Sequence, residues 1–394
     1  MPTASTRYTL DWYTARLPSP PPSIPVRAHL TRHEFLRDYA APNLPVLLAA
    51  ENTRRWRACR DWVDPTTGGP DLAYLARHFG ECKVQVAHCD EQWFSDQRRE
   101  DMSVADFCAR WDQERNEATT GWLGYAKDWH FVRQVPKYKA YSVPDAFSDD
   151  WLNLWYDCRS DCKDDYRFVY MGRAGTWTPF HADVMRSYSW SANVCGRKRW
   201  LLFPPGQEHL FTDQHGNVVY SVDHVDAAKY PRFHEAISIE VIQEPGQVLF
   251  VPSGWFHQVW NLEDTISINH NWCNQLNFDF VARSITDQLA SIQADLSHLR
   301  PLGTETEWHE HCQRMLSALA GIDTNGVRQW IRVVRAHLAL EDDRGDDIDG
   351  DPSTMLLDFP DSSIPAAEVE TWLRQLARRQ LCYASSSLLP RTTE

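Results

Sequence analysis

Short apolar runs rich in β-branched and aromatic residues dominate the middle of the chain. Seven of them are separated by Gly, Pro and Asp, and they cover residues 166–171, 188–195, 199–203, 237–242, 247–251, 255–262 and 265–272. Short strands at this spacing predict an antiparallel sandwich or barrel. The second run alternates aromatic residues with Ser189, Ser191 and Asn193, so one face of the strand is apolar and the other polar. A polar face directed into a barrel needs a ligand to satisfy it.

The N-terminal region combines helical and strand patterns. Apolar residues at helical spacing behind a Thr cap predict a helix over 31–39, and the apolar run 45–48 predicts a buried strand. A second helix is predicted over 71–79, followed by an alternating strand over 83–87. Before these elements, residues 1–25 carry a cluster of prolines among small polar residues, which favours an extended arm.

A helical period replaces the strand pattern after about residue 274. It runs from Phe278 to Leu299 and ends at Pro301. Three more helices are predicted over 308–320, 327–340 and 366–381, and between the last two lies an acidic segment, 341–353, that is typical of a solvated linker. The pattern therefore predicts three parts: the arm 1–25, a β-rich domain with N-terminal helices over 26–275, and a helical region over 276–394.

Composition and charge narrow the class of protein. The chain has 394 residues, of which 43% are hydrophobic and 24% charged, as expected for a folded globular protein. Its formal net charge of −14 argues against a binder of nucleic acid or of anionic membranes. The longest apolar run, 44–50, is far shorter than the roughly 20 residues that span a bilayer, and we expect an intracellular protein. The ten cysteines stand singly and are expected to be mostly free, buried thiols.

One segment can carry metal chemistry. It ends in His181-x-Asp183, and on a strand residues two apart point to the same face. A third ligand could come from His257, which follows two predicted strands joined by a tight turn. Two histidines and one carboxylate leave coordination positions open, as in non-heme Fe(II) oxygenases. Taken alone this pattern is a weak signal, because any pair of polar residues on a half-exposed strand would look the same.

The candidate ligands lie within longer motifs, TWTPFHAD, SYSWSANVCGRKRWLLFPPG and EPGQVLFVPSGWFHQVWNLEDTISINHNW. Together these motifs resemble the JmjC-domain family of Fe(II)- and 2-oxoglutarate-dependent oxygenases. The resemblance covers roughly residues 26–272. It implies a mainly β fold with α-helices, in which a double-stranded β-helix of the cupin or jelly-roll type is flanked by N-terminal helices and a C-terminal helical region.

The resemblance also implies roles for individual residues. His181, Asp183 and His257 match the iron ligands of the family. Lys198, in the GRKRW run, matches the lysine that pairs with the distal carboxylate of 2-oxoglutarate, and a dicarboxylate taken into a barrel must meet a fixed cation. Further matches to cosubstrate-binding positions are Thr178, Tyr125 and Asn271, and Asn193 could line the same pocket.

Within the family, YMGRAGTWTPFHADVMRSYSWSANVCGRKRWLLFPPGQE and YAKDWHF resemble the JmjC-domain-containing protein 4 group. This resemblance implies a dioxygenase that uses Fe(II), 2-oxoglutarate and O2 to hydroxylate carbon-4 of a lysine in the eukaryotic translation termination factor. Two alternatives stay open. One is a JmjC oxygenase that hydroxylates another residue or demethylates lysine on a different protein, and the other is a cupin-like module that binds metal without turnover. The C-terminal helices could also form a homodimer interface.

Overall fold

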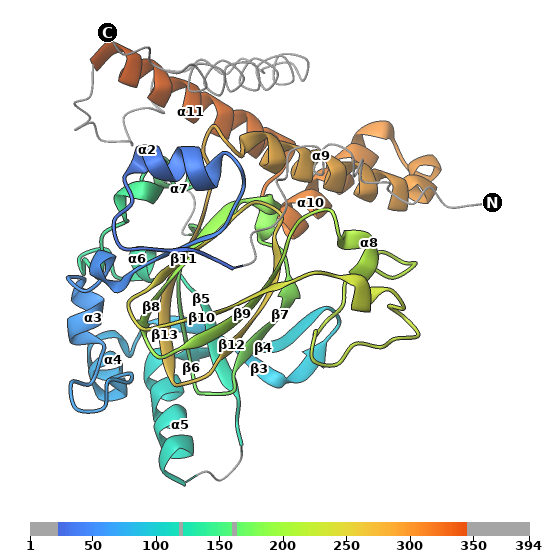
Figure 1. The fold of residues 1–394 in the computed structure, drawn as a ribbon. Helices are drawn as coiled ribbons and strands as arrows, with labels where there is room; N and C mark the ends of the chain where they lie inside the picture. The colour runs from blue at the N-terminus through green and yellow to red at the C-terminus, as the bar shows by residue number, and fades with distance from the viewer. Residues whose placement is uncertain (1–22, 118–120, 160–163, 345–394) are drawn as a thin grey trace. The chain divides into compact units, whose positions relative to one another are not determined.

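The computed structural model describes residues 23–117, 121–159 and 164–344 (Figure 1). The chain divides into two compact units. The first comprises Met1–Ser148, Asp164–Asp183 and Tyr188–Asn271, and the second comprises Asp149–Lys163, Val184–Ser187 and Trp272–Glu394. Most of the predicted arm, the larger part of the acidic linker and the helix predicted over 366–381 lie outside the described residues.

The first unit is built on two sheets. Within the described residues, the larger sheet has nine strands in the order β1-β2-β11-β8-β13-β6-β5-β3-β4, and the smaller has four in the order β10-β9-β12-β7. The strands of the larger sheet are Val26–Arg27 (β1), Val46–Leu48 (β2), Lys83–Trp93 (β3), Asp96–Ser103 (β4), Gly124–Trp129 (β5), Arg167–Gly172 (β6), Tyr188–Cys195 (β8), Val248–Val251 (β11) and Thr265–Trp272 (β13). Those of the smaller are Trp177–His181 (β7), Lys198–Phe203 (β9), Ile239–Gln243 (β10) and Phe256–Asn261 (β12).

The two sheets share one apolar core. The smaller sheet contributes Trp200, Leu202 and Ile239, and the larger contributes Leu249 and Val251, all of them buried. Burial of such side chains is the main favourable term in folding. The arrangement confirms the jelly-roll expected from the sequence (Figure 1).

All seven β-rich runs in the middle of the chain are strands. Two of them, β8 and β13, have the predicted bounds. On β13, Ile266 and Ile268 are buried on one face while Ser267 lies on the other, where its hydroxyl meets a lysine side chain from the smaller sheet. On β8, where the alternation is predicted, the Ser189 hydroxyl donates to Asp183 and the Ser191 hydroxyl to Asn269 of β13. The polar faces of both strands are therefore directed toward the interior between the two sheets.

The hydrophobic pattern does not predict β4, the edge strand of the larger sheet. This strand reads DQRREDMS, and Arg98 pairs with Glu91 while Arg99 pairs with Asp96. Charged side chains on an edge strand protect a sheet from pairing with other chains. The strand therefore lacks the apolar alternation by which an internal strand is identified. Helix α5 (Val104–Glu117), which follows it, was not predicted either.

The predicted N-terminal helices are present and are capped locally. Helix α2 (Arg32–Phe35) begins after Thr31, whose hydroxyl accepts from the Glu34 amide while the Glu34 carboxylate accepts from the Thr31 amide. It continues as a π-helical turn over Leu36–Ala40. The arm predicted over 1–25 is wrong at its end, because Ile24 is buried in the core between the sheets. The other short helices of this unit are Arg57–Asp61 (α3), Leu72–Phe79 (α4), Phe131–Gln134 (α6) and Glu208–Phe211 (α8).

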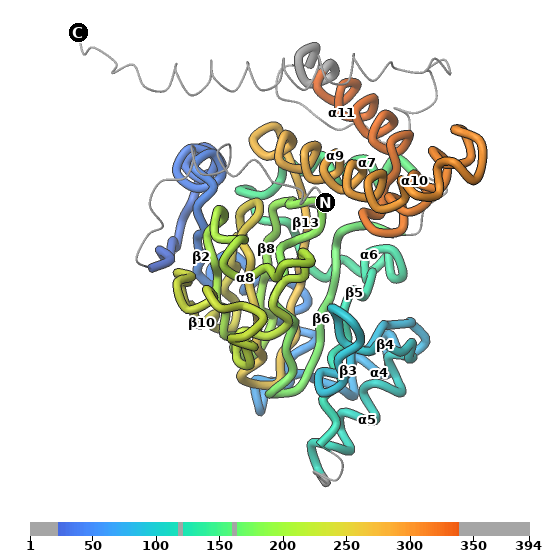
Figure 2. Tube along the Cα trace, turned by 90° about the vertical axis from the view of Figure 1, so that its right-hand side faces the viewer, coloured from blue at the N-terminus to red at the C-terminus, as the bar shows by residue number. Residues whose placement is uncertain are grey.

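The second unit is helical. Its described helices are Trp151–Asp157 (α7), Phe278–Asp295 (α9), Glu305–Ala320 (α10) and Thr324–Arg344 (α11), with α10 packed on α9 and α11 on α7 (Figure 2). Trp330 joins the last pair, because it is fully buried, stacks on Trp155 and donates its indole N–H to the carbonyl of Trp151 over 2.7 Å. The unit therefore has an apolar core of its own.

Two predicted boundaries in this unit are wrong. Helix α9 ends at Asp295, and Pro301 lies inside a separate 3-10 turn, Ser297–Leu302. Helix α11 continues to Arg344, so the first four residues of the predicted acidic linker are helical. The predicted stop at Gly321 is confirmed by its left-handed φ of 71°. Among the described residues, no helix is both long and apolar enough to cross a membrane.

Candidate functional site

Three potential metal ligands meet where β7 and β12 lie side by side in the smaller sheet. His181 is the last residue of β7 and is paired in register with His257 on β12. Asp183 follows two residues later, beyond the end of the strand. The prediction that His181 and Asp183 share one face of a strand is therefore wrong. One ligand atom from each residue nevertheless lies within 4.8 Å of the other two.

The ring orientation of both histidines suits a metal. Nδ1 of His181 lies 2.7 Å from the carbonyl oxygen of Pro179, and Nδ1 of His257 lies 3.0 Å from that of Trp255. A carbonyl can only accept, so each Nδ1 carries the proton and each Nε2 keeps its lone pair. The two rings are 4.3 Å apart between centroids. This pairing of a metal-binding nitrogen with a hydrogen-bonded second nitrogen is usual for histidine ligands.

The charges of the side chains in this site favour the binding of a cation. Burial, together with the neighbouring His257, lowers the pKa of His181 to about 4, so its ring is neutral at physiological pH. The carboxylate of Asp183 is oriented by two donors, the Asn271 amide at 2.9 Å and the Ser189 hydroxyl at 2.7 Å, one on each oxygen. Two imidazoles and one fixed carboxylate on one side of a metal leave its other positions open. These three residues can therefore hold Fe(II) and still admit a cosubstrate.

A buried ammonium group lies deeper between the sheets. Lys198, at the start of β9, is 2% exposed, and its Nζ is 2.7 Å from the Ser267 hydroxyl and 3.4 Å from the Tyr125 hydroxyl. No carboxylate of the described residues forms an ion pair with it. Burial and a second nearby lysine lower the pKa of Lys198 to about 7. A buried cation held only by neutral hydroxyl groups is suited to an anionic ligand.

Two of the four other residues predicted to bind the cosubstrate contact Lys198 or Asp183. Tyr125 is buried beside Lys198 and Asn271 contacts Asp183, as described above. Thr178 lies half-buried on β7, paired with Val259 of β12, and its hydroxyl makes no hydrogen bond to the described residues. Asn193 donates its side-chain amide to the main-chain carbonyls of Gly196 and Gln243, and its side-chain oxygen has no donor among the described residues. The roles of Thr178 and Asn193 stay predictions.

The sequence reasoning missed three interior residues, Ser267, Gln97 and Lys127. Ser267 bonds Lys198 and is buried completely. Lys127 is also buried, and its Nζ donates to the side-chain oxygen of Gln97 over 2.7 Å. Lys127 stands in the YAKDWHF motif, two residues after Tyr125, so strand alternation could have placed both on one face. Nothing in the sequence alone indicates that Gln97 lies beside Lys127.

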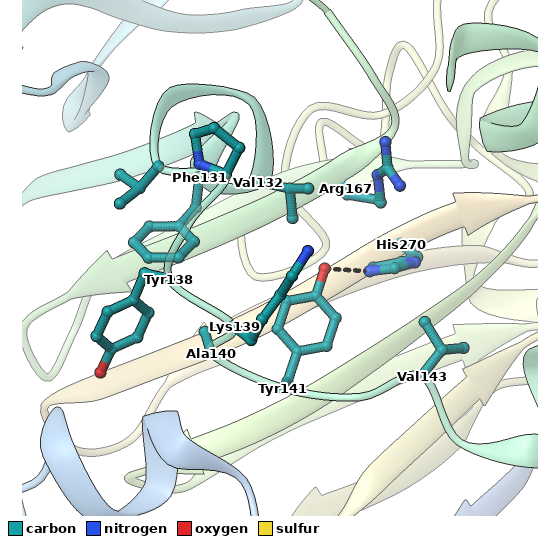
Figure 3. A pocket seen from close by; sticks show the side chains of 11 residues that line it. Phe131, Val132, Tyr138, Lys139, Ala140, Tyr141, Val143, Arg167 and His270 are labelled. Atoms are coloured by element: carbon teal, nitrogen blue, oxygen red, sulfur yellow. Dashed lines mark hydrogen bonds between the residues drawn. The ribbon is translucent and has the colours of Figure 1, made fainter. Parts of the chain in front are cut away.

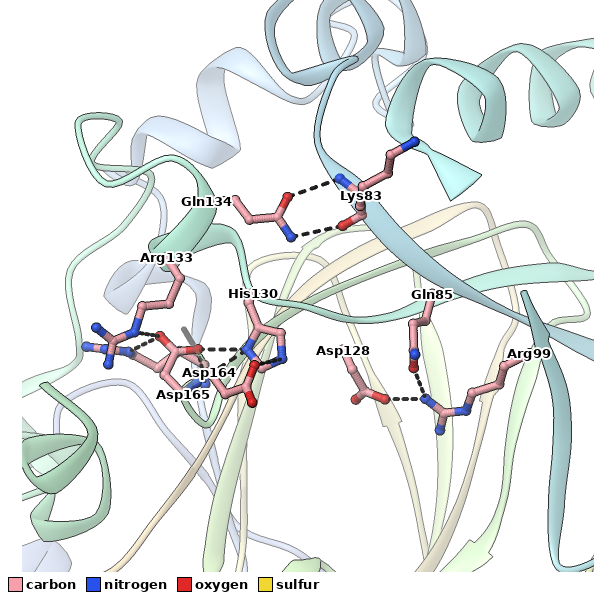
Figure 4. Close-up of polar contacts among 10 residues, drawn as sticks. Lys83, Gln85, Arg99, Asp128, His130, Arg133, Gln134, Asp164 and Asp165 are labelled. Atoms are coloured by element: carbon pink, nitrogen blue, oxygen red, sulfur yellow. Dashed lines mark hydrogen bonds and ion pairs between the residues drawn. The ribbon is translucent and has the colours of Figure 1, made fainter. Parts of the chain in front are cut away.

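Ion pairs fix the C-terminal end of β5 and the residues that follow it (Figure 4). Asp128, which has a left-handed φ of 54°, is bound by Arg99 and accepts from the Tyr170 hydroxyl over 2.7 Å. Beyond it, the fully buried carboxylate of Asp165 is bound by His130 and Arg167 at 3.0 and 2.8 Å, with a third contact from Arg133. These anchors hold β5 in place and with it the side chains of Tyr125 and Lys127.

A second hollow opens on the other face of the larger sheet (Figure 3). It has a volume of about 170 Å³ and is bordered by Lys139, Arg167, Tyr141 and His270. Burial lowers the pKa of His270 well below its ordinary value, and its Nε2 shares a hydrogen bond of 2.6 Å with the Tyr141 hydroxyl. His270 precedes Asn271 on β13, and strand alternation directs the two side chains to opposite faces. This hollow is therefore separate from the metal-binding side of the sheet.

A further cluster of possible ligands, His88, Asp90 and Glu91, is less suited to a metal. Asp90 and Glu91 are exposed, and Arg98 already binds the Glu91 carboxylate. Exposed carboxylates neutralised by arginine attract a cation weakly. The cluster of His181, Asp183 and His257 is the better candidate among the described residues.

Comparison with known proteins identifies relatives over most of the chain. The family described as "Cupin-like domain" matches residues 32–278. The chain is 45% identical over 308 residues to the 2-oxoglutarate and iron-dependent oxygenase JMJD4 of Danio rerio, covering 76% of this chain and 72% of that protein. It is 42% identical over 307 residues to JMJD4 of Homo sapiens, with coverage of 76% and 72%.

A plant relative carries a different activity in its name. The chain is 45% identical over 311 residues to the arginine-specific demethylase JMJ20 of Arabidopsis thaliana. The match covers 75% of this chain and 66% of the plant protein, so the chain spans just under two thirds of its length. Two relatives that are each 45% identical to this chain thus carry different names, one a 2-oxoglutarate and iron-dependent oxygenase and the other an arginine-specific demethylase.

Proposed function

This chain belongs to the cupin-like JmjC oxygenases that depend on iron and 2-oxoglutarate, and we propose that it hydroxylates a protein substrate. The observation that carries the proposal is the presence of two features on the same four-stranded sheet. His181, Asp183 and His257 present a three-ligand face for Fe(II), and the buried ammonium of Lys198, held by the Ser267 hydroxyl, supplies a cation for the distal carboxylate of 2-oxoglutarate in this proposal. A module that only bound metal would need no buried, unpaired lysine.

The residues of the chain prepare the site in distinct ways. When bound, iron and 2-oxoglutarate supply the oxidising chemistry, in which 2-oxoglutarate is decarboxylated to succinate as O2 is consumed. His181 and His257 would hold the metal through Nε2, because their Nδ1 protons are already given to carbonyl groups. Asn271 and Ser189 keep the Asp183 carboxylate in position. Ser267 and Tyr125 orient Lys198 toward the distal carboxylate of the cosubstrate.

We further propose that the substrate is a lysine, hydroxylated at carbon-4, in the eukaryotic translation termination factor. Support comes from the resemblance of the sequence motifs to the JmjC-domain-containing protein 4 group and from the identity of 42–45% to oxygenases of that name. The proposal implies a cytoplasmic enzyme. A homodimer through the C-terminal helices stays a separate prediction.

A second candidate function is demethylation of a methylated arginine or lysine. The observation that favours it is the 45% identity to the Arabidopsis arginine-specific demethylase. Hydroxylation of a carbon and removal of an N-methyl group use the same metal and cosubstrate, and they differ in which C–H bond lies next to the iron. The product mass separates them, because hydroxylation adds one oxygen and demethylation removes one methylene.

The test uses the full chain with Fe(II), 2-oxoglutarate and O2. Recombinant termination factor, unmodified or carrying methylated arginine or lysine, is incubated with the protein and analysed by peptide mass spectrometry. One added oxygen on a single lysine supports the proposed reaction and substrate. Loss of a methylene supports the second candidate instead, and an unchanged substrate with continued formation of succinate refutes the assigned substrate while retaining the oxygenase.

A further inference from the structure

The interior contains a second buried lysine that the proposed mechanism does not use. Lys127 on β5 is 2% exposed, as is Lys198 on β9. Lys127 stands two residues after Tyr125 on a regular stretch of strand, in register with β3. Side chains two apart share a strand face. Since the Tyr125 hydroxyl reaches Lys198 on the facing sheet, the Lys127 side chain is directed into the same interior.

The groups that hold Lys127 are neutral and well fixed. Its Nζ donates to the side-chain oxygen of Gln97 over 2.7 Å, and it lies 5.4 Å from the centroid of the Tyr125 ring. The amide nitrogen of Gln97 donates in turn to the carbonyl of Trp177 over 3.2 Å, so Gln97 cannot swing away freely. An ammonium group has three donors. The described residues occupy one of them with a hydrogen bond.

The charge of Lys127 has no direct counter-ion. None of the described carboxylates forms an ion pair with it, and the two acidic side chains whose charge acts on it, Asp96 and Asp128, are both bound by Arg99. Burial lowers the pKa of Lys127 to about 8, which leaves it mostly protonated at neutral pH. A buried cation without a carboxylate is costly unless a ligand supplies one.

The position of Lys127 relates it to both halves of the candidate site. Tyr125 lies beside both lysines, because its hydroxyl is 3.4 Å from Nζ of Lys198 and the centroid of its ring is 5.4 Å from Nζ of Lys127. Gln97, which holds Lys127, is bonded to the carbonyl of Trp177 on β7, the strand that ends at His181. 2-Oxoglutarate carries a carboxylate at each end, and Lys198 can meet only one of them.

We propose that Lys127 is a second anion-binding residue of the interior, which engages the 2-oxo acid end of 2-oxoglutarate while Lys198 engages the distal carboxylate. This inference rests on the proposed function, because it requires the cosubstrate to bind between the two lysines. It adds a binding residue, held by Gln97, that acts on the ligand through charge and hydrogen bonding.

The test measures binding without turnover. Full-length protein loaded with Fe(II) and kept free of O2 is titrated calorimetrically with 2-oxoglutarate and with 2-oxopentanoate, which has the same 2-oxo acid end and no distal carboxylate. Lys127→Met should weaken both ligands by a similar factor of about tenfold or more. Lys198→Met should weaken 2-oxoglutarate at least as much and leave 2-oxopentanoate within about twofold. Lys137→Met, which removes an exposed lysine, serves as the control for net charge.

A second variant tests the charge while keeping the lysine. Gln97→Glu places a carboxylate 2.7 Å from Nζ in the present geometry, so it should reproduce the loss seen in Lys127→Met. Unchanged affinity for both ligands in Lys127→Met would overturn the inference. A loss confined to 2-oxoglutarate would also overturn it, because Lys127 would then serve the distal carboxylate. A wild-type protein that binds neither ligand would refute the proposed function together with this inference.

Discussion

Replacing Lys198 by Met should stabilise the ligand-free protein and weaken its binding of 2-oxoglutarate. The pKa of this buried lysine is lowered from 10.5 to about 7. A lysine whose pKa is lower in the folded than in the unfolded state reduces the free energy of unfolding. The reduction is greatest at a pH below the folded-state pKa and disappears as the pH rises toward 10.5. Each tenfold change in proton affinity corresponds to about 1.4 kcal/mol. The buried lysine therefore lowers the free energy of unfolding by on the order of 4 kcal/mol at pH 7 and by about 2 kcal/mol at pH 9.

The substitution also has a cost. It removes the hydrogen bond to the Ser267 hydroxyl and the contact with the Tyr125 hydroxyl, and leaving these buried groups unsatisfied costs about 1–3 kcal/mol. The variant should therefore be more stable than the wild type by roughly 1–3 kcal/mol at pH 7 and should lose about 2 kcal/mol of that advantage by pH 9. Without the ammonium, a bound dicarboxylate loses a buried partner worth about 3–5 kcal/mol, or roughly two to three and a half orders of magnitude in affinity.

Urea unfolding followed by tryptophan fluorescence at pH 7 and pH 9 measures the stability difference, and calorimetric titration under nitrogen measures 2-oxoglutarate binding. Lys137→Met is the matched control, because it removes the same charge from an exposed position. A Lys198→Met variant that is less stable than the wild type at pH 7 would contradict the reasoning that the lysine is an unpaired buried cation. Affinity for 2-oxoglutarate equal to that of the control would contradict its role as the anchor.

Three further variants test the supports of the site and of the helical unit. Asn271→Ala removes a donor from Asp183 and should weaken Fe(II) binding by about tenfold to a hundredfold, measured by competition with a chelator. Trp330→Ala removes a fully buried side chain and its hydrogen bond to Trp151, so it should destabilise the helical unit by about 3–5 kcal/mol in hydrogen-exchange measurements. Thr304→Ala removes the capping box at the start of α10 and should cost about 1 kcal/mol in the same measurement.

Each of these expectations has a clear contrary result. Unaltered Fe(II) affinity in Asn271→Ala would mean that Asp183 needs no second support. Unchanged exchange rates in Trp330→Ala would mean that the helices do not depend on this core. If Thr304→Ala leaves the hydrogen-exchange rates of α10 unchanged, packing alone fixes the start of the helix.

Local periodicity predicted the strands that build the site. Tyr188–Cys195 and Thr265–Trp272 have their predicted bounds because apolar and polar side chains alternate on internal strands of a sheet whose faces differ. The edge strand Asp96–Ser103 escaped prediction because its side chains are charged, so no apolar period marks it. The end of α9 was misplaced because the 3-10 turn after it continues the apolar spacing to Leu299.

The candidate site was predicted by residue type and motif more than by geometry. His181 and His257 were expected to meet, and the register of β7 with β12 brings them together. Asp183 reaches the same point from a loop, which strand alternation could not indicate. Lys127 was overlooked since a lysine in a sequence is usually a surface residue, and only the pairing of β5 with its neighbours shows that it is buried.

The central claim is that His181, Asp183 and His257 form the iron centre of a 2-oxoglutarate-dependent oxygenase. The most direct test is to measure succinate formed from 2-oxoglutarate by the full chain with Fe(II), O2 and the termination factor, comparing the wild type with Asp183→Ala. The account predicts that the wild type forms succinate together with oxidised substrate, and that the folded variant forms neither. Succinate formation by Asp183→Ala at the rate of the wild type would contradict the assignment of the metal centre.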